Sequence, residues 1–558
     1  MWTRLAPLMV AALVAFIAGA AVGGGGDDPR RSTARTFAEA WARSDYAAMH
    51  ALLTPAAQRR VPLERFAAAY RDAAKVVTLS KLDAGRPGEP RAGTVPVPVT
   101  LRTRIFGTLS GRVALPVVEL EDGAAVDWRP YLVHPGLRPG EKLSRTTSLP
   151  PRAAIQARDG TPIAEGEARV SELGAVAADV AGRIGPAPPE RAAELARRGV
   201  PADASVGLTG LEREFDAELA GRPGGELRAG GRTLASVAPR RGSAVRTTID
   251  PAIQAAAVTA LAGRYGGVAV TRPDNGEVLA LAGVAYSAPQ PPGSVFKIIT
   301  LAAALEAGVA KPSDDYPVQT AATLEGVQLE NAHGESCGGS LRMSFAHSCN
   351  SVFAPLGAEL GAERLVAASE RFGFNEEPAL AGALPSTIPA AGEIGDDLAV
   401  GSSAIGQGRV LATPLAMAGV AGAIATDGML VRPTLRKGSS TERTRATSEQ
   451  VAGTVGRFMR AVVTSGTGVG AAIPGVKVAG KTGTAELRDS TESSDPADPT
   501  APPADDPTDT DAWFAAYAPA RRPRVAVAVL LVGQGAGGET AAPVAKVVIE
   551  AALERRGT

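Results

Sequence analysis

The sequence predicts a multidomain α+β protein, and three observations support that prediction. The chain has 558 residues, too many for a single hydrophobic core. Its N-terminal part shows helical periodicity first and strand alternation afterwards. Its C-terminal part shows strand patterns near both ends and carries helical patterns between them. We therefore expect four segments, at residues 1–26, 27–145, 146–245 and 246–558.

The first segment contains an uncharged apolar run at residues 5–22. Arg4 precedes the run, and Asp27 and Asp28 follow it. A run of this length can just cross a bilayer, with its positive end inside. We expect a single-pass anchor in the cell membrane, with everything from about Asp27 onward extracytoplasmic. The alternative is a cleaved signal peptide, because Ala18-Gly19-Ala20 supplies small residues of the cleavable kind.

Residues 27–145 are expected to form a cone of helices and a bent sheet. The expected helices span residues 33–43, 46–53 and 62–76. The expected strands span residues 95–101, 105–109, 111–120 and 123–128. No polar constellation in this part suggests catalysis, so it is interpreted as a spacer.

Residues 146–245 are interpreted as a structural module. The stretch at 151–164 opens it, and Gly207-Leu208-Thr209-Gly210-Leu211-Glu212 lies in its second half. Thr209 followed by Glu212 has the spacing of a helix capping box. We expect that box at the start of a helix.

Residues 246–558 are expected to fold as an antiparallel sheet with helices on both faces. The expected strands are residues 266–270, 277–282, 476–480, 512–517 and 525–531. The expected helices run from Ser294 and over residues 344–360, 362–372, 413–425 and 543–553. A groove should separate the edge strand that carries Lys481 from the helices that carry Ser348.

Ser294 and Lys297 supply a nucleophile and a base at a usable spacing. The run Pro291-Pro292-Gly293 stops the preceding coil, and an apolar helix follows it. Residues three apart share a helix face, so the Ser294 hydroxyl and the Lys297 amine can meet. Apolar surroundings should lower the pKa of Lys297 and let it take the serine proton. An isolated Ser-x-x-Lys is more often a helix cap followed by a solvated lysine.

Two later segments favour chemistry over chance. Ser348-Cys349-Asn350 and Lys481-Thr482-Gly483-Thr484 follow in that order. Ser-x-x-Lys, a Ser-x-Asn segment and Lys-Thr-Gly are the signature set of penicillin-binding proteins and class A β-lactamases. Residues from about 246 to 552 therefore resemble a penicillin-binding-protein transpeptidase domain with the serine β-lactamase-like fold.

The resemblance implies a role for each motif residue. Ser294 is the expected acylated nucleophile and Lys297 its base. Ser348 would pass a proton to the leaving amine, and Asn350 would bond Lys297 and the substrate amide. The substrate carboxylate is assigned to Lys481, Thr482 and Thr484, with Gly483 leaving room for substrate beside the strand. The backbone N–H groups of Ser294 and Thr484 would form the oxyanion hole.

The other two domains also have family counterparts. Residues 146–245 resemble the dimerisation, or pedestal, domain of class B penicillin-binding proteins, although Ala153 and Ala157 replace the family's glycine and aspartate. Residues 27–145 resemble the nuclear-transport-factor-like domain of MecA-type resistance transpeptidases. No glycosyltransferase domain precedes the pedestal, which argues against a bifunctional class A enzyme.

The function implied is a membrane-anchored peptidoglycan D,D-transpeptidase that β-lactams acylate. Its expected partners are stem peptides or their lipid-linked precursor, β-lactams, the membrane, and a glycosyltransferase of the division or elongation machinery. The alternatives are hydrolysis, by a D,D-carboxypeptidase or a β-lactamase, and a non-catalytic scaffold or β-lactam sensor. The formal net charge of +0 gives no support for nucleic-acid binding. We expect no cofactor or metal, because His50, His134, His333 and His347 lack metal-ligand spacing.

Two further features lie near the motifs. Cys337 and Cys349 are the only cysteines, and an oxidising compartment would favour a disulfide between them. The alternative is two reduced, buried thiols. Residues 489–511 are acidic and rich in proline, which predicts a flexible insertion beside the groove.

Overall fold

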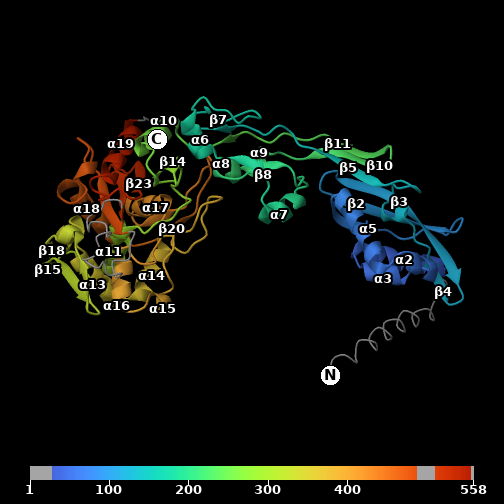
Figure 1. Cartoon of the computed structure of the whole chain (residues 1–558), viewed down its shortest axis with the longest axis horizontal. Coiled ribbons are helices and arrows are strands. Elements are labelled where there is room, and N and C mark those ends of the chain that lie inside the picture. The colour runs from blue at the N-terminus through green and yellow to red at the C-terminus, as the bar shows by residue number, and fades with distance from the viewer. Residues whose placement is uncertain (1–27, 487–508, 555–558) are drawn as a thin grey trace, which may run out of the picture. The chain divides into compact units, whose positions relative to one another are not determined.

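The computed structural model describes residues 28–486 and 509–554, which divide into two compact units (Figure 1). The first unit comprises the chain up to residue 150 together with residues 188–202 and 222–240. The second comprises residues 151–187 and 203–221 and the chain from residue 241.

Two predicted features fall outside these described residues. They are the apolar N-terminal segment and most of the acidic insertion. Within the described part of the chain, no helix combines the length and the apolar character needed to cross a membrane.

The described part of the N-terminal unit opens with helices, and strands follow with short helices among them. The helices are α2 (Pro29–Ala42), α3 (Tyr46–Ala51), α4 (Pro55–Arg60), α5 (Leu63–Val76), η1 (Pro130–Val133), η2 (Pro189–Arg191) and α7 (Ala192–Arg197). The strands are β1 (Leu79–Ala84), β2 (Thr94–Thr103), β3 (Thr108–Leu120), β4 (Gly123–Val126), β5 (Leu143–Ser148), β10 (Gly224–Ala229) and β11 (Arg232–Val237). Asp45 and Thr54 cap the helices that follow them, because their side-chain oxygens accept backbone N–H groups.

A sheet in the order β1-β2-β3-β4 packs against these helices. Strand β2 alternates strictly, and Val95, Val97, Val99 and Leu101 are at most 2% exposed. The helix aromatics Phe66 and Tyr70 fill the space beneath the sheet. The cone predicted from the sequence is therefore confirmed.

Its details differ from the prediction in three places. Helix α4 and strand β1 were not predicted, and both are short and rich in polar residues. The two strands expected at 105–109 and 111–120 are one strand, β3. Ile105 and Phe106 lie in the turn before β3 and are buried in a small separate cluster with Leu227.

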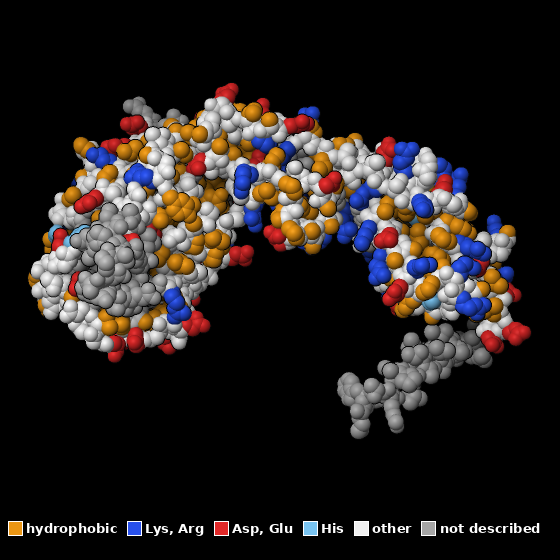
Figure 2. Space-filling model, viewed as in Figure 1, with side chains coloured by type: hydrophobic (Ala, Val, Ile, Leu, Met, Phe, Trp, Pro, Cys, Tyr) orange, Lys and Arg blue, Asp and Glu red, His pale blue; other side chains and the backbone are white. Residues whose placement is uncertain are grey.

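Basic side chains are spread over the visible face of the N-terminal unit (Figure 2). Lysine and arginine outnumber aspartate and glutamate in this unit, and the reverse holds in the rest of the chain. The neutrality of the whole chain is therefore a balance between two unlike parts.

The structure divides the predicted 146–245 module between the two units, and the elements of this region that belong to the second unit are short. They are β6 (Ile155–Gln156), β7 (Pro162–Ala164), α6 (Ala175–Ala181), β8 (Ile184–Pro186), β9 (Ser205–Gly207), α8 (Gly210–Glu214), α9 (Asp216–Leu219) and β12 (Val245–Arg246). The predicted capping box is wrong. Thr209 makes no side-chain cap, and its hydroxyl accepts the Arg183 N–H at 3.0 Å. Glu212 is instead buried between Arg152 and Arg169, so burial with two cations outweighs the local motif.

The large sheet of the second unit has the order β14-β13-β23-β22-β21, and every neighbouring pair is antiparallel. Its strands are β13 (Gly266–Thr271), β14 (Val278–Gly283), β21 (Ala479–Glu486), β22 (Thr510–Ala518) and β23 (Val525–Leu531). Helices α10 (Pro251–Leu261) and α19 (Ala541–Glu554) cover one face. Helices α11 (Lys297–Glu306), α17 (Pro414–Ala425) and α18 (Glu449–Ser465) lie on the other. The predicted sheet with helices on both faces is confirmed (Figure 1).

The remaining elements of this unit surround the helical side. They are η3 (Gly293–Phe296), β15 (Asp315–Gln319), β16 (Ala321–Leu324), β17 (Val327–Glu330), η4 (Ala332–Gly334), β18 (Cys337–Ser340), α12 (Leu341–Ala346), α13 (Asn350–Leu360), α14 (Ala362–Arg371), α15 (Ala391–Ile394), α16 (Asp397–Ala404), β19 (Met429–Val431), β20 (Arg443–Arg445) and η5 (Val469–Ala471).

Two boundaries differ from the prediction in ways that matter for the site. The single helix expected over 344–360 is two helices, α12 and α13, with a break at residues 347–349. The strand expected at 476–480 begins at Ala479 and continues to Glu486, so Lys481 lies within β21 and not at its end.

Candidate active site

Ser294 lies in the 3-10 turn η3, immediately before helix α11. The turn is pressed against strand β21. Gly293 has φ +52, and a Cβ at that position would lie 2.5 Å from the Thr484 carbonyl oxygen. Only glycine allows this approach. The sequence Pro291-Pro292-Gly293 therefore delivers a partly exposed serine to the edge of the sheet.

The Lys297 side chain is completely buried and surrounded by three short polar contacts. Its Nζ lies 2.6 Å from Asn350 Oδ1, 2.7 Å from the Ser348 carbonyl oxygen and 3.0 Å from Ser294 Oγ. Two of these partners can only accept, so they take two N–H groups of the amine. The third direction faces the serine hydroxyl, and in a neutral amine it holds the lone pair. The Lys297 amine is therefore placed to accept the Ser294 proton.

Electrostatics favours the neutral form of Lys297. Burial lowers the pKa of Lys297 well below its ordinary value, and the nearby charge of Lys481 lowers it further. The predicted desolvation of this lysine thus has a direct structural cause, since α11 is buried over almost its whole length.

Ser348 occupies the break between α12 and α13. Its backbone is left-handed, with φ +64, which is uncommon for a residue with a side chain. The Cys349 N–H donates to the Ser344 carbonyl at 2.9 Å and the Asn350 side chain donates to the Glu330 carbonyl at 2.7 Å. These contacts hold the break on both sides, and the Ser348 hydroxyl lies within reach of Lys297 and Lys481.

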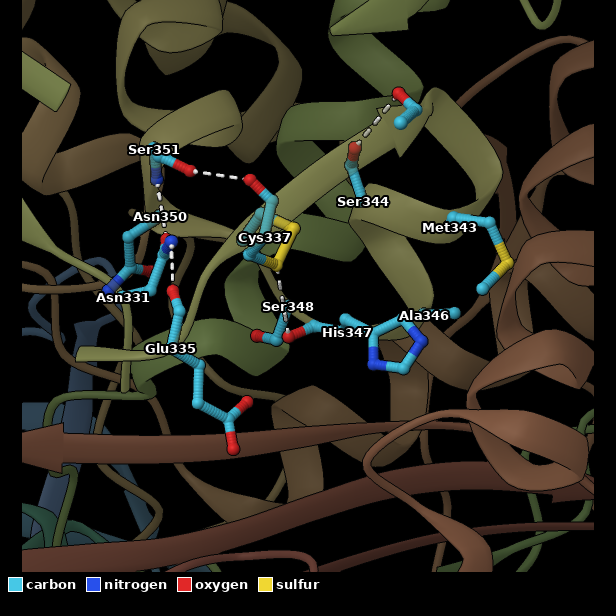
Figure 3. The surroundings of a disulfide bond; sticks show 12 residues. Asn331, Glu335, Cys337, Met343, Ser344, Ala346, His347, Ser348, Asn350 and Ser351 are labelled. Carbon is cyan, nitrogen blue, oxygen red and sulfur yellow. Dashed lines mark hydrogen bonds between the residues drawn. A yellow bond between two sulfur atoms is a disulfide. The ribbon is translucent and has the colours of Figure 1, made fainter. Parts of the chain in front are cut away.

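A disulfide joins Cys337 on β18 to Cys349 in this break (Figure 3). The two Cα atoms are 5.5 Å apart, and both side chains are buried. The Ser351 hydroxyl donates to the Cys337 carbonyl at 3.4 Å, which adds a second link between the same two segments. The residue between Ser348 and Asn350 is thereby tied to a neighbouring strand. His347, next to Ser348, is exposed.

Lys481 completes the cluster from strand β21. Its side chain is fully buried, and its Nζ donates to Ser348 Oγ at 2.8 Å and to the Thr482 carbonyl at 3.0 Å. Burial lowers the pKa of Lys481 to about 7. The Ser348 hydroxyl therefore bridges two lysines, because Lys297 Nζ also lies 3.4 Å from Ser348 Oγ.

The rest of the Lys-Thr-Gly-Thr segment follows along β21. Thr482 is buried, Thr484 is half-buried, and the Gly537 N–H lies 3.5 Å from Thr484 Oγ1. Gly483 has a packing role that was not predicted. A Cβ there would lie 2.7 Å from the Pro292 carbonyl oxygen and 2.9 Å from Trp513 Cβ, so it would push the serine turn off the strand. The close packing of η3 on β21 therefore requires glycine, and the room it leaves for substrate stays a prediction.

One contact was missed by sequence reasoning. Thr467, which follows α18, has its hydroxyl 2.5 Å from Thr482 Oγ1. The only signal in the sequence is the tight Ser465-Gly466-Thr467-Gly468 run after a helix. That run predicts a turn but no partner.

The site contains the parts of an acyl-transfer centre. It has a hydroxyl nucleophile, a buried amine in contact with it, a second hydroxyl within reach of both lysines, and a strand edge beside them. Among residues 28–486 and 509–554, no group of histidine, cysteine or acidic side chains could hold a metal ion.

Three family models match the chain. Residues 266–550 match the penicillin-binding protein transpeptidase domain. Residues 147–246 match the penicillin-binding protein dimerisation domain, and residues 30–141 match the NTF2-like N-terminal transpeptidase domain.

Individual proteins show the same likeness. The chain is 35% identical over 419 residues to peptidoglycan D,D-transpeptidase PbpA of Mycolicibacterium smegmatis, which covers 62% of this chain and 79% of that protein. The penicillin G acyl-enzyme complex of penicillin-binding protein A from M. tuberculosis is similar with a TM-score of 0.57 and 30% identity, over 72% of this chain and 99% of that one. The D,D-transpeptidase domain of a peptidoglycan glycosyltransferase from Eggerthella lenta is similar with a TM-score of 0.59 and 29% identity, over 73% of this chain and 99% of that one.

Proposed function

Because the chain belongs to the class B penicillin-binding protein transpeptidases, we propose that it cross-links peptidoglycan through an acyl intermediate on Ser294. One observation carries the assignment of residues. Ser294, Lys297, Ser348, Asn350 and Lys481 come from three distant parts of the sequence and meet within hydrogen-bond distance.

Acylation follows from these contacts. Lys297 Nζ takes the Ser294 proton while Ser294 Oγ attacks the carbonyl carbon of the penultimate D-alanine of a stem peptide. The new C–O bond forms as the peptide C–N bond breaks. The proton passes from Lys297 through the Ser348 hydroxyl to the departing nitrogen, and free D-alanine leaves. Asn350 keeps Lys297 oriented throughout.

The second half-reaction reverses the proton path. An amine of a neighbouring stem peptide attacks the acyl carbon, and its proton moves to Lys297. The Ser294 ester bond breaks, and Ser294 Oγ recovers a proton from Lys297. The products are a cross-linked peptide and free enzyme.

Substrate is held from the β21 side. Lys481 provides positive charge near the terminal carboxylate, and Thr482 and Thr484 provide hydroxyls. The backbone N–H groups of Ser294 and Thr484 stabilise the negative oxygen that develops during attack. A β-lactam presents a carbonyl and a carboxylate with a similar relation, so it acylates Ser294 by the same route. The penicillin G complex of the M. tuberculosis relative supports this.

The other parts of the chain connect the transpeptidase domain to the membrane. We assign residues 27–145 to a spacer, 146–245 to a pedestal and 246–558 to the transpeptidase domain, in support of which the three family models match these regions. The apolar residues 5–22 anchor the chain in the cell membrane. We propose a glycosyltransferase of the division or elongation machinery and a lipid-linked precursor as the partners that supply the glycan strands.

Labelling with a fluorescent penicillin tests the proposal directly. The wild-type protein should form one covalent adduct, and Ser294→Ala should form none. Ser465→Ala is a matched serine control and should label as the wild type does. The Ser465 hydroxyl is exposed, and its hydrogen bond is to Ala461 in its own helix. An adduct of equal intensity on Ser294→Ala would refute the assignment.

The acylation rate should depend on pH in a bell-shaped manner. Lys297 must be neutral, so the rate rises as pH rises through its lowered pKa. Lys481 must be charged to attract the carboxylate, so the rate falls as pH rises through about 7. The measurement is the second-order rate constant of penicillin acylation between pH 4 and 10. On each limb of the profile this rate constant should change roughly tenfold per pH unit.

A charge-preserving variant separates the two limbs. Lys481→Arg stays protonated over this range, so its alkaline limb should disappear even if the rate is lower overall. A wild-type rate that kept rising up to pH 9 would contradict the role given to Lys481.

A further inference from the structure

Thr467 joins three parts of the second unit at one point. It follows helix α18, and its hydroxyl lies 2.5 Å from Thr482 Oγ1 on β21. Its backbone N–H donates to the Ala346 carbonyl at 3.1 Å, two residues before Ser348. The distance from its hydroxyl to the same carbonyl is 3.4 Å, which is a weak contact.

The backbone around Thr467 is fixed by close packing. A Cβ on Gly466 would lie 2.2 Å from the Ala346 carbonyl oxygen. A Cβ on Gly538 would lie 2.2 Å from the Thr467 carbonyl oxygen. Two segments of the same chain therefore contact this loop from two sides, and these backbone contacts set the position of Thr467.

The hydrogen bond between Thr467 and Thr482 can have either hydroxyl as its donor. Each threonine hydroxyl has one proton and can also accept, whereas a carboxylate only accepts. If Thr482 donated to Thr467, it would have no proton left for a substrate carboxylate. If Thr467 donates to Thr482, the Thr482 proton remains available, and both hydroxyls are satisfied.

We infer that Thr467 is a positioning residue for recognition of the substrate carboxylate, because its hydroxyl donates to Thr482 and thereby directs the Thr482 proton at the ligand. The inference rests on the proposed function. In this arrangement Thr467 donates a hydrogen bond to Thr482, and Thr482 donates one to the carboxylate. The first hydrogen bond polarises the Thr482 hydroxyl, so the bond to the carboxylate is stronger than one from a threonine without such a donor. Thr467 touches no substrate itself.

This role concerns a specific chemical group on the substrate. The hydroxyl pair should matter for ligands with an anionic carboxylate and should not matter for ligands that lack the negative charge at that position. A merely structural role, such as holding the Ser348 segment through Ala346, would affect both kinds of ligand equally.

Valine and serine at position 467 test the inference with a penicillin and its methyl ester. Valine keeps the shape and the backbone bond to Ala346 and removes only the hydroxyl. Thr467→Val should lower the second-order rate constant for the penicillin about tenfold and that for the ester less than about twofold. Thr467→Ser should restore the wild-type preference for the carboxylate.

Two further variants sharpen the result. Combining Thr467→Val with Thr482→Val should slow penicillin acylation no more than Thr482→Val does alone, because one hydroxyl acts through the other. Thr464→Val, on the exposed face of α18, is the matched control and should react as the wild type does. Thermal unfolding of each variant should remain close to that of the wild type.

The outcomes separate this inference from the proposed function. If Thr467→Val slows penicillin and ester by the same factor, the inference is overturned while the transpeptidase assignment stands. A double variant much slower than Thr482→Val alone would also overturn it. A wild-type protein that formed no adduct with either compound would overturn the proposed function and this inference with it.

Discussion

Replacing Lys297 with methionine should lower the rate of Ser294 acylation by about three orders of magnitude, the scale of a lost general base. The methionine side chain is close in length to lysine and apolar, so it fits the fully buried site. Without the amine, nothing within hydrogen-bond distance of Ser294 Oγ in the described structure takes its proton. The measurement is the second-order rate constant for a fluorescent penicillin, with thermal unfolding measured in parallel.

A second lysine provides the control for this experiment. Lys477→Met changes an exposed lysine shortly before β21 and should leave acylation unchanged. Methionine at position 297 also leaves the Ser348 carbonyl and Asn350 Oδ1 without a donor, so a modest loss of stability is expected. A rate within about tenfold of the wild type would show that another group removes the serine proton.

The active site could be predicted from sequence to the extent that its chemistry is local. Ser294 and Lys297 are one helical turn apart, so their contact at 3.0 Å follows from helix geometry alone. The lowered pKa of Lys297 could also be predicted, because the residues after it are almost all apolar. The meeting with Ser348 and Lys481 could not be derived in this way. It was inferred from motif order, and the structure brings these side chains together.

The break at Ser348 shows what periodicity cannot reveal. One helix was predicted over residues 344–360, yet the backbone turns left-handed at Ser348. Contacts from distant segments impose this conformation, namely the disulfide from Cys337 and the bond from Asn350 to Glu330. A strained backbone at such a point is maintained only when its surroundings determine it. Helix propensity and periodicity depend on nearby residues only, so they do not predict contacts with distant segments.

Gly483 has a packing role that the sequence did not reveal. The glycine was predicted to leave space for substrate, and the structure adds that a Cβ there would meet the Pro292 carbonyl oxygen and Trp513 Cβ. Alternation along β21 puts Lys481 and Gly483 on the same face, against which the serine turn packs. The strand was predicted to end at residue 480, before the Lys-Thr-Gly segment, whereas β21 continues to Glu486. Without the correct boundary, the face on which each of these residues lies could not be predicted.

The capping-box prediction failed for a reason that leads to a stability experiment. Glu212 was expected to bond its own helix start, but its side chain is 1% exposed and contacts two arginines. The Arg152 Nε atom donates to Glu212 Oε2 at 2.6 Å, and the Arg169 Nε atom donates to Glu212 Oε1 at 2.7 Å. Arg152 also pairs with buried Asp216 at 2.9 Å. Two cations and two carboxylates thus balance within the pedestal.

Changing Glu212 to glutamine should destabilise the second unit by about 3 kcal/mol, the scale of breaking one partner of a buried ion pair. Glutamine keeps the shape of the side chain but leaves the buried guanidinium groups with one carboxylate between them. The effect should exceed that of Glu442→Gln, whose partner Arg432 lies 3.4 Å away on the surface and whose pair is worth less than about 1 kcal/mol. Calorimetric unfolding of both variants compares the two losses directly. Equal losses would contradict this prediction and would mean that water reaches the buried cluster and screens its charges.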